Sequence, residues 1–256
     1  MKAVGLHPDV VVVTSRIYQT TATLVRSGGE AFAIDSPILP DELELLPSIA
    51  RQAGFAVVGC LVTHGDWDHL LARYAFPDAP LGIAESTAAR LRNEPGTAQR
   101  ELRDFDEEHY VERTGPLSLG RPETTQALPV PGHCGIGERE LELHPADGHT
   151  QDGMAIWMPW ARVLVCGDYL SPVEIPWISA GGSRDAYLAT LARLEPLVEQ
   201  ADVVIPGHGE PLDSVRALAI LREDRAYLEG LPDSALPLAR RTKAQRKIHE
   251  DNLKRL

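Results

Sequence analysis

Short apolar segments alternate with polar stretches along this chain, and their spacing predicts where strands and helices form. Near the start, β-branched or alternating segments are separated by turn residues such as Gly28 and Gly29, the pattern of an antiparallel meander. These segments are residues 10–13, 22–25 and 31–34. Acidic residues followed by apolar residues at helical spacing then predict a helix from Asp41 towards Gly54. The chain is thus predicted to begin with a sheet that a helix covers.

A second set of apolar segments predicts further strands, each followed by polar residues. Residues 55–62 form the longest apolar run, which is typical of a buried strand. Between residues 72 and 120 the pattern is weak, with a short strand near 81–83 and a charged stretch over 90–113 that could cover a site. Further strands are predicted at 141–143, 154–158, 163–166 and 203–205, and helices at 184–199 and 215–228. This order of elements predicts two stacked sheets flanked outside by helices.

The composition supports one folded domain. The 256 residues are 43% apolar and 24% charged, close to the average of globular proteins and sufficient to bury a core. We expect a domain over residues 1–232 and a basic C-terminal helical tail over residues 233–256, the latter a solvated helix. The three cysteines cannot all pair, and two of them lie in apolar runs, so a disulfide framework is not expected.

Charge and hydropathy limit the classes of partner. The net charge of −12 disfavours generic nucleic-acid binding, because it repels a polyphosphate backbone. The longest apolar run is far shorter than the ~20 residues of a membrane span, and the N-terminus lacks a basic stretch leading into an apolar segment. We therefore expect a cytoplasmic protein that acts on a small-molecule substrate, with neither nucleic acid nor membrane as a partner. The sequence leaves open whether it forms a homo-oligomer.

The densest group of chemically active residues follows the buried strand. The loop Thr63-His64-Gly65-Asp66-Trp67-Asp68-His69 holds two imidazoles and two carboxylates within seven positions. A surface loop can carry such residues for solubility, but the end of a buried strand places them rigidly, as a metal site requires. Histidine nitrogens and carboxylate oxygens suit zinc, iron or manganese, and the loop contains no cysteine. This loop therefore predicts a metal site.

Three further segments place a histidine or an aspartate beside glycine after a predicted strand. They are Asp147-Gly148-His149, Gly167-Asp168 and Gly207-His208-Gly209. Glycine beside a ligand removes side-chain bulk and permits the backbone angles that aim the ligand inward. Each segment alone is more typical of a turn or a structural histidine. Together, and in this order, they predict that distant parts of the chain meet at one metal site.

This set of residues resembles the signature of the metallo-β-lactamase superfamily, HxHxDH followed by a distant His, an Asp and a final His. The resemblance covers residues 10–228 and implies an α+β fold, a four-layer αββα sandwich of two mixed sheets with the metals at its open edge. It assigns His64, Asp66 and His149 to a first metal, Asp68, His69 and His208 to a second, and Asp168 to a bridge between them. Asp35 matches an early aspartate of the family that supports the site without being a ligand.

The chain departs from the signature at its second histidine, which is Asp66 here. A carboxylate adds negative charge and a harder donor, which favours iron or manganese somewhat over zinc. It also puts in doubt whether the shorter side chain reaches the first metal. The flavodiiron relatives have a carboxylate at the same position, so two divalent ions, with zinc preferred, remain the expectation.

The resemblance implies a hydrolase in which two metals hold a bridging hydroxide as nucleophile, with Asp68 orienting it. A small ester, thioester or lactone is the expected substrate. The alternatives are an iron-dependent oxidoreductase like the sulfur dioxygenases or flavodiiron proteins, a phosphodiesterase, or a non-catalytic binding module. Residues near the ligand segments that are expected to contact the substrate are Trp67, Tyr169, Glu174 and Trp177. His133 and Cys134, in a predicted glycine-rich loop, are further candidates for the pocket lining.

Overall fold

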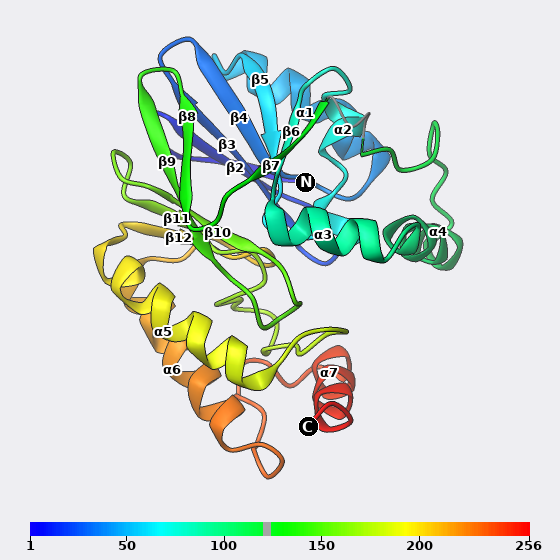
Figure 1. Cartoon of the computed structure of the whole chain (residues 1–256), viewed down its shortest axis with the longest axis vertical. Helices are drawn as coiled ribbons and strands as arrows, with labels where there is room; N and C mark the ends of the chain where they lie inside the picture. The colour runs from blue at the N-terminus through cyan, green and yellow to red at the C-terminus, as the bar shows by residue number, and fades with distance from the viewer. Residues whose placement is uncertain (120–123) are drawn as a thin grey trace.

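Two mixed β-sheets pack face to face, with helices on both outer faces, in the computed structural model of the chain (Figure 1). The structure describes residues 1–119 and 124–256. This arrangement is the predicted four-layer αββα sandwich. The first sheet has the strand order β1-β2-β3-β4-β5-β6-β7 and the second the order β12-β11-β10-β9-β8.

The first sheet combines an antiparallel half with a parallel half. Strands β2 to β4 form the antiparallel meander that the apolar pattern predicts, β1 extends it in antiparallel, and β5 to β7 then add in parallel. The bounds are β1 Lys2–His7, β2 Val10–Thr14, β3 Thr21–Ser27, β4 Glu30–Asp35, β5 Val57–Leu61, β6 Leu81–Ala84 and β7 Thr125–Leu128. Parallel neighbours bring their carboxyl ends to the same edge, and this is why the loop after β5 lies beside the end of β4.

The second sheet is antiparallel except for its last pair. Strands β8 to β11 pair in sequence order, and β12 joins β11 in parallel. The bounds are β8 Gly132–Ile136, β9 Arg139–Pro145, β10 Met154–Met158, β11 Val163–Val165 and β12 Val203–Ile205. The loops after β9, β11 and β12 carry His149, Asp168 and His208, so three predicted ligands follow strands of this sheet.

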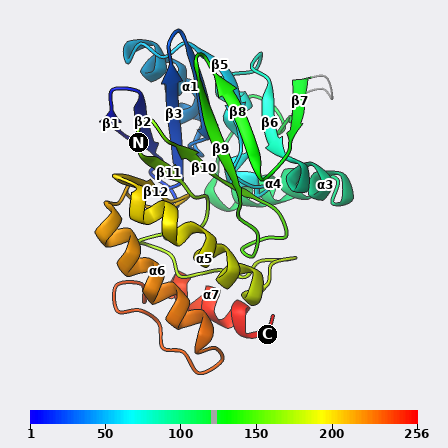
Figure 2. The ribbon, with the colours of Figure 1, turned by 60° about the vertical axis from the view of Figure 1, so that its left-hand side comes forward.

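The helices cover the two outer faces, and Figure 2 shows α5 and α6 running together along the second sheet. Their bounds are α1 Pro40–Gln52, the 3-10 turn η1 Trp67–His69, α2 Ala72–Ala75, α3 Glu85–Asn93, α4 Thr97–His109, α5 Arg184–Gln200, α6 Ser214–Glu229 and α7 Lys243–Leu253. None of these helices is long and apolar enough to cross a lipid bilayer, within the part of the chain that is described.

Three apolar clusters join the four layers. One lies between the sheets and contains Ile34, Leu143 and Ile156. The other two lie between each sheet and its helices, with Leu46 of α1 in one and Leu191 of α5 in the other. The sandwich therefore has an apolar seam at each layer boundary, which holds the strand ends rigidly in place.

Three strands, β1, β7 and β8, are missing from the pattern read from the sequence. The glycine-rich segment around His133 and Cys134 is strand β8, paired in register with β9, and not a loop. Its side chains, apart from the buried Ile136, are exposed or half-buried, so the segment lacks the apolar alternation that would have marked it as a strand. Strands β1 and β7 escaped prediction for the same reason, since β1 has no buried residue and β7 has one. Neither His133 nor Cys134 belongs to the candidate metal centre described next.

Candidate metal centre

Local hydrogen bonds fix the loop after β5. The backbone N–H of Thr63 donates to Asp35 Oδ1, and the Thr63 hydroxyl donates to Oδ2, both at 2.8 Å. The 3-10 turn η1 then folds the loop back, so that the His64 and His69 rings lie 4.3 Å apart. Two side chains five positions apart in the sequence thereby face the same space at the edge of the sandwich.

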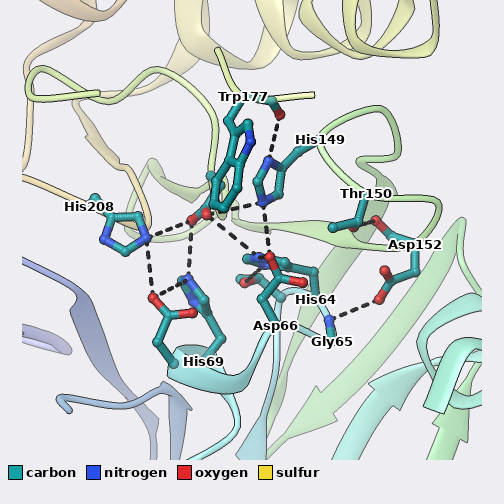
Figure 3. Close-up of polar contacts among 12 residues, drawn as sticks. His64, Gly65, Asp66, His69, His149, Thr150, Asp152, Trp177 and His208 are labelled. Atoms are coloured by element: carbon teal, nitrogen blue, oxygen red, sulfur yellow. Dashed lines mark hydrogen bonds and ion pairs between the residues drawn. The ribbon is translucent and has the colours of Figure 1, made fainter. Parts of the chain in front are cut away.

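The first group of ligand-type residues consists of His64, Asp66 and His149 (Figure 3). Oδ2 of Asp66 lies 3.2 Å from His149 Nε2 and 3.7 Å from His64 Nε2. The two histidines are 3% exposed. These atoms lie within 4.8 Å of one another, close enough to share one ion. Asp66 does reach this group despite its short side chain.

The second group consists of Asp68, His69 and His208. Oδ2 of Asp68 lies 3.4 Å from His208 Nε2 and 3.8 Å from His69 Nε2. All three residues are buried. The group lies beside the first one, since the His64 and His69 rings are in contact.

Asp168 lies between the two groups. Its Oδ2 is 3.3 Å from His149 Nε2 and 3.6 Å from His64 Nε2, whereas its Oδ1 is 3.1 Å from His69 Nε2 and 3.4 Å from His208 Nε2. One oxygen therefore faces each group, as a bridging carboxylate requires. The structure thus brings together all seven residues that the sequence singled out as ligands.

Buried atoms without hydrogen bonds show that these residues fit metal ions. Among the described residues, Nε2 of His64, Nε2 of His69 and Oδ1 of Asp168 are buried and make no hydrogen bond, although the last two atoms approach to 3.1 Å. Such unpaired polar atoms cost free energy in a folded protein. Imidazole nitrogens and carboxylate oxygens at this spacing are donors that divalent ions accept. The donor set therefore fits metal binding.

In three of the histidines, Nδ1 lies within hydrogen-bond distance of an oxygen outside the ligand-type residues. Nδ1 of His69 lies 3.0 Å from Asp35 Oδ2, as expected for an aspartate that supports the site without being a ligand. Nδ1 of His149 lies 2.8 Å from the carbonyl oxygen of Trp177, and Nδ1 of His208 lies 3.0 Å from that of Tyr18. In the neutral imidazole that binds a metal, a donor N–H at Nδ1 leaves Nε2 with a free lone pair, and here each Nε2 faces the other ligand-type residues.

Crowded carboxylates change the protonation of the metal-free site. Burial alone lowers the pKa of His149, but Asp66 and Asp168 outweigh it and raise that pKa to about 9. Burial likewise lowers the pKa of His208, and Glu174 and Asp168 raise it to about 10. Burial raises the pKa of Asp66, yet its contacts with His149 and His64 hold it well below its usual range. Without metal, protons on the histidines balance the carboxylates.

Comparison with known proteins decides the family. The model of the metallo-beta-lactamase superfamily matches residues 16–208, which is more than half of the chain. The chain belongs to the metallo-beta-lactamase superfamily.

Several solved structures share the fold of this chain. A metallo-beta-lactamase family protein from Thermus thermophilus is 21% identical, with a TM-score of 0.69 over 98% of this chain and 95% of that one. The DIM-1 metallo-beta-lactamase is 20% identical, with a TM-score of 0.61 over 89% of this chain and 96% of that one. A sec-alkylsulfatase from Pseudomonas sp. is 16% identical, with a TM-score of 0.72 over 96% of this chain and 47% of that one. At these identities the likeness shows the fold alone.

A glycine lies against the carboxylate of Asp168. Gly207 precedes His208, and a Cβ atom built on it would overlap Oδ1 of Asp168 and lie 3.0 Å from Cε1 of His69. Only glycine allows the backbone to approach the site this closely. The glycine beside the final histidine is therefore a requirement of packing around the ligands.

The four residues expected at the substrate lie in different places. The Trp177 side chain is 37% exposed beside the His149 ring, and the half-buried Glu174 interacts electrostatically with His208 and Asp168. Trp67 packs on Phe105 of α4, with ring centroids 4.7 Å apart.

Tyr169 lies behind the site and is only 2% exposed. Its hydroxyl donates to Asp147 O and accepts from the His149 N–H. Tyr169 therefore supports the loop that carries His149. The sequence had instead predicted a contact with the substrate.

The C-terminal segment packs against a loop of the site, although the sequence did not mark any of its residues as part of the site. Arg240 and Asn252 are almost fully buried against the loop over residues 171–178, which contains Trp177. The bonds run from Arg240 Nη1 to Glu174 O at 2.8 Å, from Ile175 N to Gln245 Oε1 at 2.7 Å and from Ile178 N to Asn252 Oδ1 at 2.8 Å. The sequence predicted a solvated helix here; α7 instead buries Gln245 and Asn252, and Arg240 before the helix is buried too, which a charge pattern cannot reveal. The domain boundary after residue 232 stays a prediction.

Sequence reasoning missed two charged residues of the site. Arg90 of α3 and Asp152, after His149, are buried and paired with each other, with Arg90 Nη1 2.9 Å from Asp152 Oδ1. Asp152 Oδ2 also accepts the N–H of Gly65, inside the ligand loop. Arg90 is the first residue of the charged stretch over 90–113. Nothing in the sequence pattern distinguishes it from the other arginines of that stretch.

Proposed function

We propose that this protein is a metal-dependent hydrolase that holds two divalent ions, with zinc preferred, and acts on a small acyl compound such as an ester, thioester or lactone. The convergence of seven ligand-type side chains, with unpaired atoms facing one another, carries the proposal. Membership of the metallo-beta-lactamase superfamily supports it. Two of the similar structures are named as a beta-lactamase and an alkylsulfatase, both names for hydrolases.

Divalent ions at these positions would polarise the bond to be cleaved and lower the pKa of water. The residues of the chain would arrange the rest. His64, Asp66 and His149 would hold one ion, Asp68, His69 and His208 the other, and Asp168 both. Asp68, whose side chain is the most exposed of its group, would orient the attacking water and accept its proton. The Trp177 side chain beside His149 would form an apolar wall for the substrate.

The charge around the centre favours a neutral acyl substrate over a phosphoryl one. Asp66, Asp68 and Asp168 offset much of the charge of two divalent ions. Glu174 and Glu101 add two carboxylates that interact with this group. The nearby cation Arg90 is already paired with Asp66 and Asp152, so it is not free to bind an anionic substrate.

Metal analysis combined with a small substrate panel tests the proposal. We expect protein purified without added metal, and then loaded with zinc, to hydrolyse at least one ester, thioester or lactone, and His208→Ala to lose this activity. Iron together with oxygen consumption would instead support the oxidoreductase that the Asp66 oxygen donor allows. Cleavage of phosphodiesters alone would contradict the acyl assignment.

A further inference from the structure

The two oxygens of the Asp66 carboxylate face different partners. Oδ2 faces His149 and His64, at 3.2 and 3.7 Å. Oδ1 instead lies 2.8 Å from Nη1 of Arg90. Because the guanidinium occupies one oxygen, only the other is directed at the first metal position. The carboxylate is therefore held in one orientation.

Arg90 is in turn fixed by a second carboxylate. Its side chain is 8% exposed, and the same Nη1 lies 2.9 Å from Oδ1 of Asp152, which is fully buried. Asp152 Oδ2 accepts the N–H of Gly65 at 2.9 Å. Thus α3, the ligand loop and the loop after β9 meet through a row of alternating charges, carboxylate, guanidinium and carboxylate. An unpaired arginine would be very unfavourable at this depth, so both partners are needed.

We propose that Arg90 is the positioning residue that makes Asp66 an effective ligand for the first metal. It orients the carboxylate so that Oδ2 faces the ion, and it offsets one negative charge of a ligand set richer in carboxylates than the usual signature. The inference rests on the proposed metal centre and explains how the chain accommodates aspartate where a neutral histidine is usual. A histidine there would need no cation behind it.

The test is zinc binding to Arg90→Met, measured as metal content and by competition with a chromophoric chelator. Arg90→Met keeps the apolar stem and removes the guanidinium. We expect one zinc site to weaken about 10- to 100-fold, the usual effect of removing a partner behind a ligand, while the other stays unchanged. Arg90→Lys should show a smaller loss of the same site, because an ammonium keeps the positive charge but not the rigid placement of Nη1 between the two carboxylates.

Two comparisons separate positioning from stability. Arg113→Met removes another buried arginine, paired with Asp106 at 2.8 Å away from the ligands, and should keep both zinc sites. Combining Arg90→Met with Asp66→His should restore the weakened site, because a neutral ligand needs no guanidinium. Wild-type zinc affinity in both Arg90 variants would overturn the inference, and so would equal losses in Arg113→Met.

The outcome for the wild-type protein distinguishes this inference from the proposed function. Two zinc ions per chain are expected. A single zinc ion at Asp68, His69 and His208 would overturn the role of Arg90 but leave metal-dependent hydrolysis standing. A protein that binds no zinc, iron or manganese would overturn both.

Discussion

Nδ1 of His69 lies 3.0 Å from Oδ2 of Asp35, a residue at the end of β4 that is outside the seven candidate ligands. The same carboxylate accepts the N–H and the hydroxyl of Thr63, directly before His64. One buried aspartate thus fixes both the first histidine of the ligand loop and the ring of the last. The geometry of the candidate metal centre therefore depends on a residue that contacts no metal position.

Asp35→Asn should weaken zinc binding at the second group about 10- to 100-fold. An amide that keeps its oxygen towards His69 must present its NH2 to the Thr63 N–H, which leaves two donors facing each other. Competition with a chromophoric chelator measures the change. Asp41→Asn, at an exposed carboxylate paired with Arg16, is the matched control and should bind zinc normally. Unchanged zinc affinity in Asp35→Asn would show that zinc binding does not depend on the contact between Asp35 and His69 Nδ1.

Gly207→Ala should reduce activity about 100-fold, because a displacement of roughly 1 Å at a reacting centre has effects of that size. The added methyl group would overlap Oδ1 of Asp168 and move the carboxylate that faces both groups of ligands. Steady-state rates and zinc content together measure this effect. Gly29→Ala, where a Cβ meets nothing within 4 Å, should behave as wild type. Full activity in Gly207→Ala would refute the tight packing described around Asp168.

The stability of the metal-free protein should depend on pH in a direction set by its histidines. The pKa values of His149 and His208 are raised to about 9 and about 10, so their ion pairs stabilise the fold fully below about pH 6.5. This stabilisation is lost as the pH rises through 9 and 10. Asp66 has a lowered pKa, and its contribution is lost only in strong acid.

Thermal unfolding of chelator-treated protein between pH 6 and 10.5 measures this dependence. We expect the melting temperature to fall across the range, and zinc affinity to rise, because zinc displaces those protons. Replacing both His149 and His208 by alanine should flatten the fall. A slope that persists in the double variant would assign it to other groups.

Asn252→Ala should loosen the loop that holds His149. It removes the acceptor for Ile178 N and the donor to Pro176 O, and leaving such buried groups unpaired costs about 1–3 kcal/mol. Because the carbonyl of Trp177 in this loop accepts from His149, zinc affinity at the first group should fall as well. Lys254→Ala, at an exposed residue of the same segment, is the control. Chemical denaturation and zinc titration provide the measurements; a loss of stability with unchanged zinc binding would limit the segment to a structural role.

The sequence predicted most of the sandwich and the seven ligand-type residues that the structure brings together, because both leave local signals. Apolar runs mark the buried strands, and a histidine or aspartate beside glycine marks the ends of several of them. Strand β8 left no such signal, since four of its five residues are exposed or half-buried. Residues far apart in the sequence that support the site, such as Arg90 and Asn252, look like ordinary helix residues. Only the three-dimensional packing shows that they are buried against the ligand loops.

Anomalous diffraction from crystals of zinc-loaded protein tests the central claim most directly. The account predicts two peaks at the edge of the sandwich, one among His64, Asp66 and His149 and one among Asp68, His69 and His208, with Asp168 contacting both. No peak among these residues, or zinc bound only elsewhere on the chain, would contradict it.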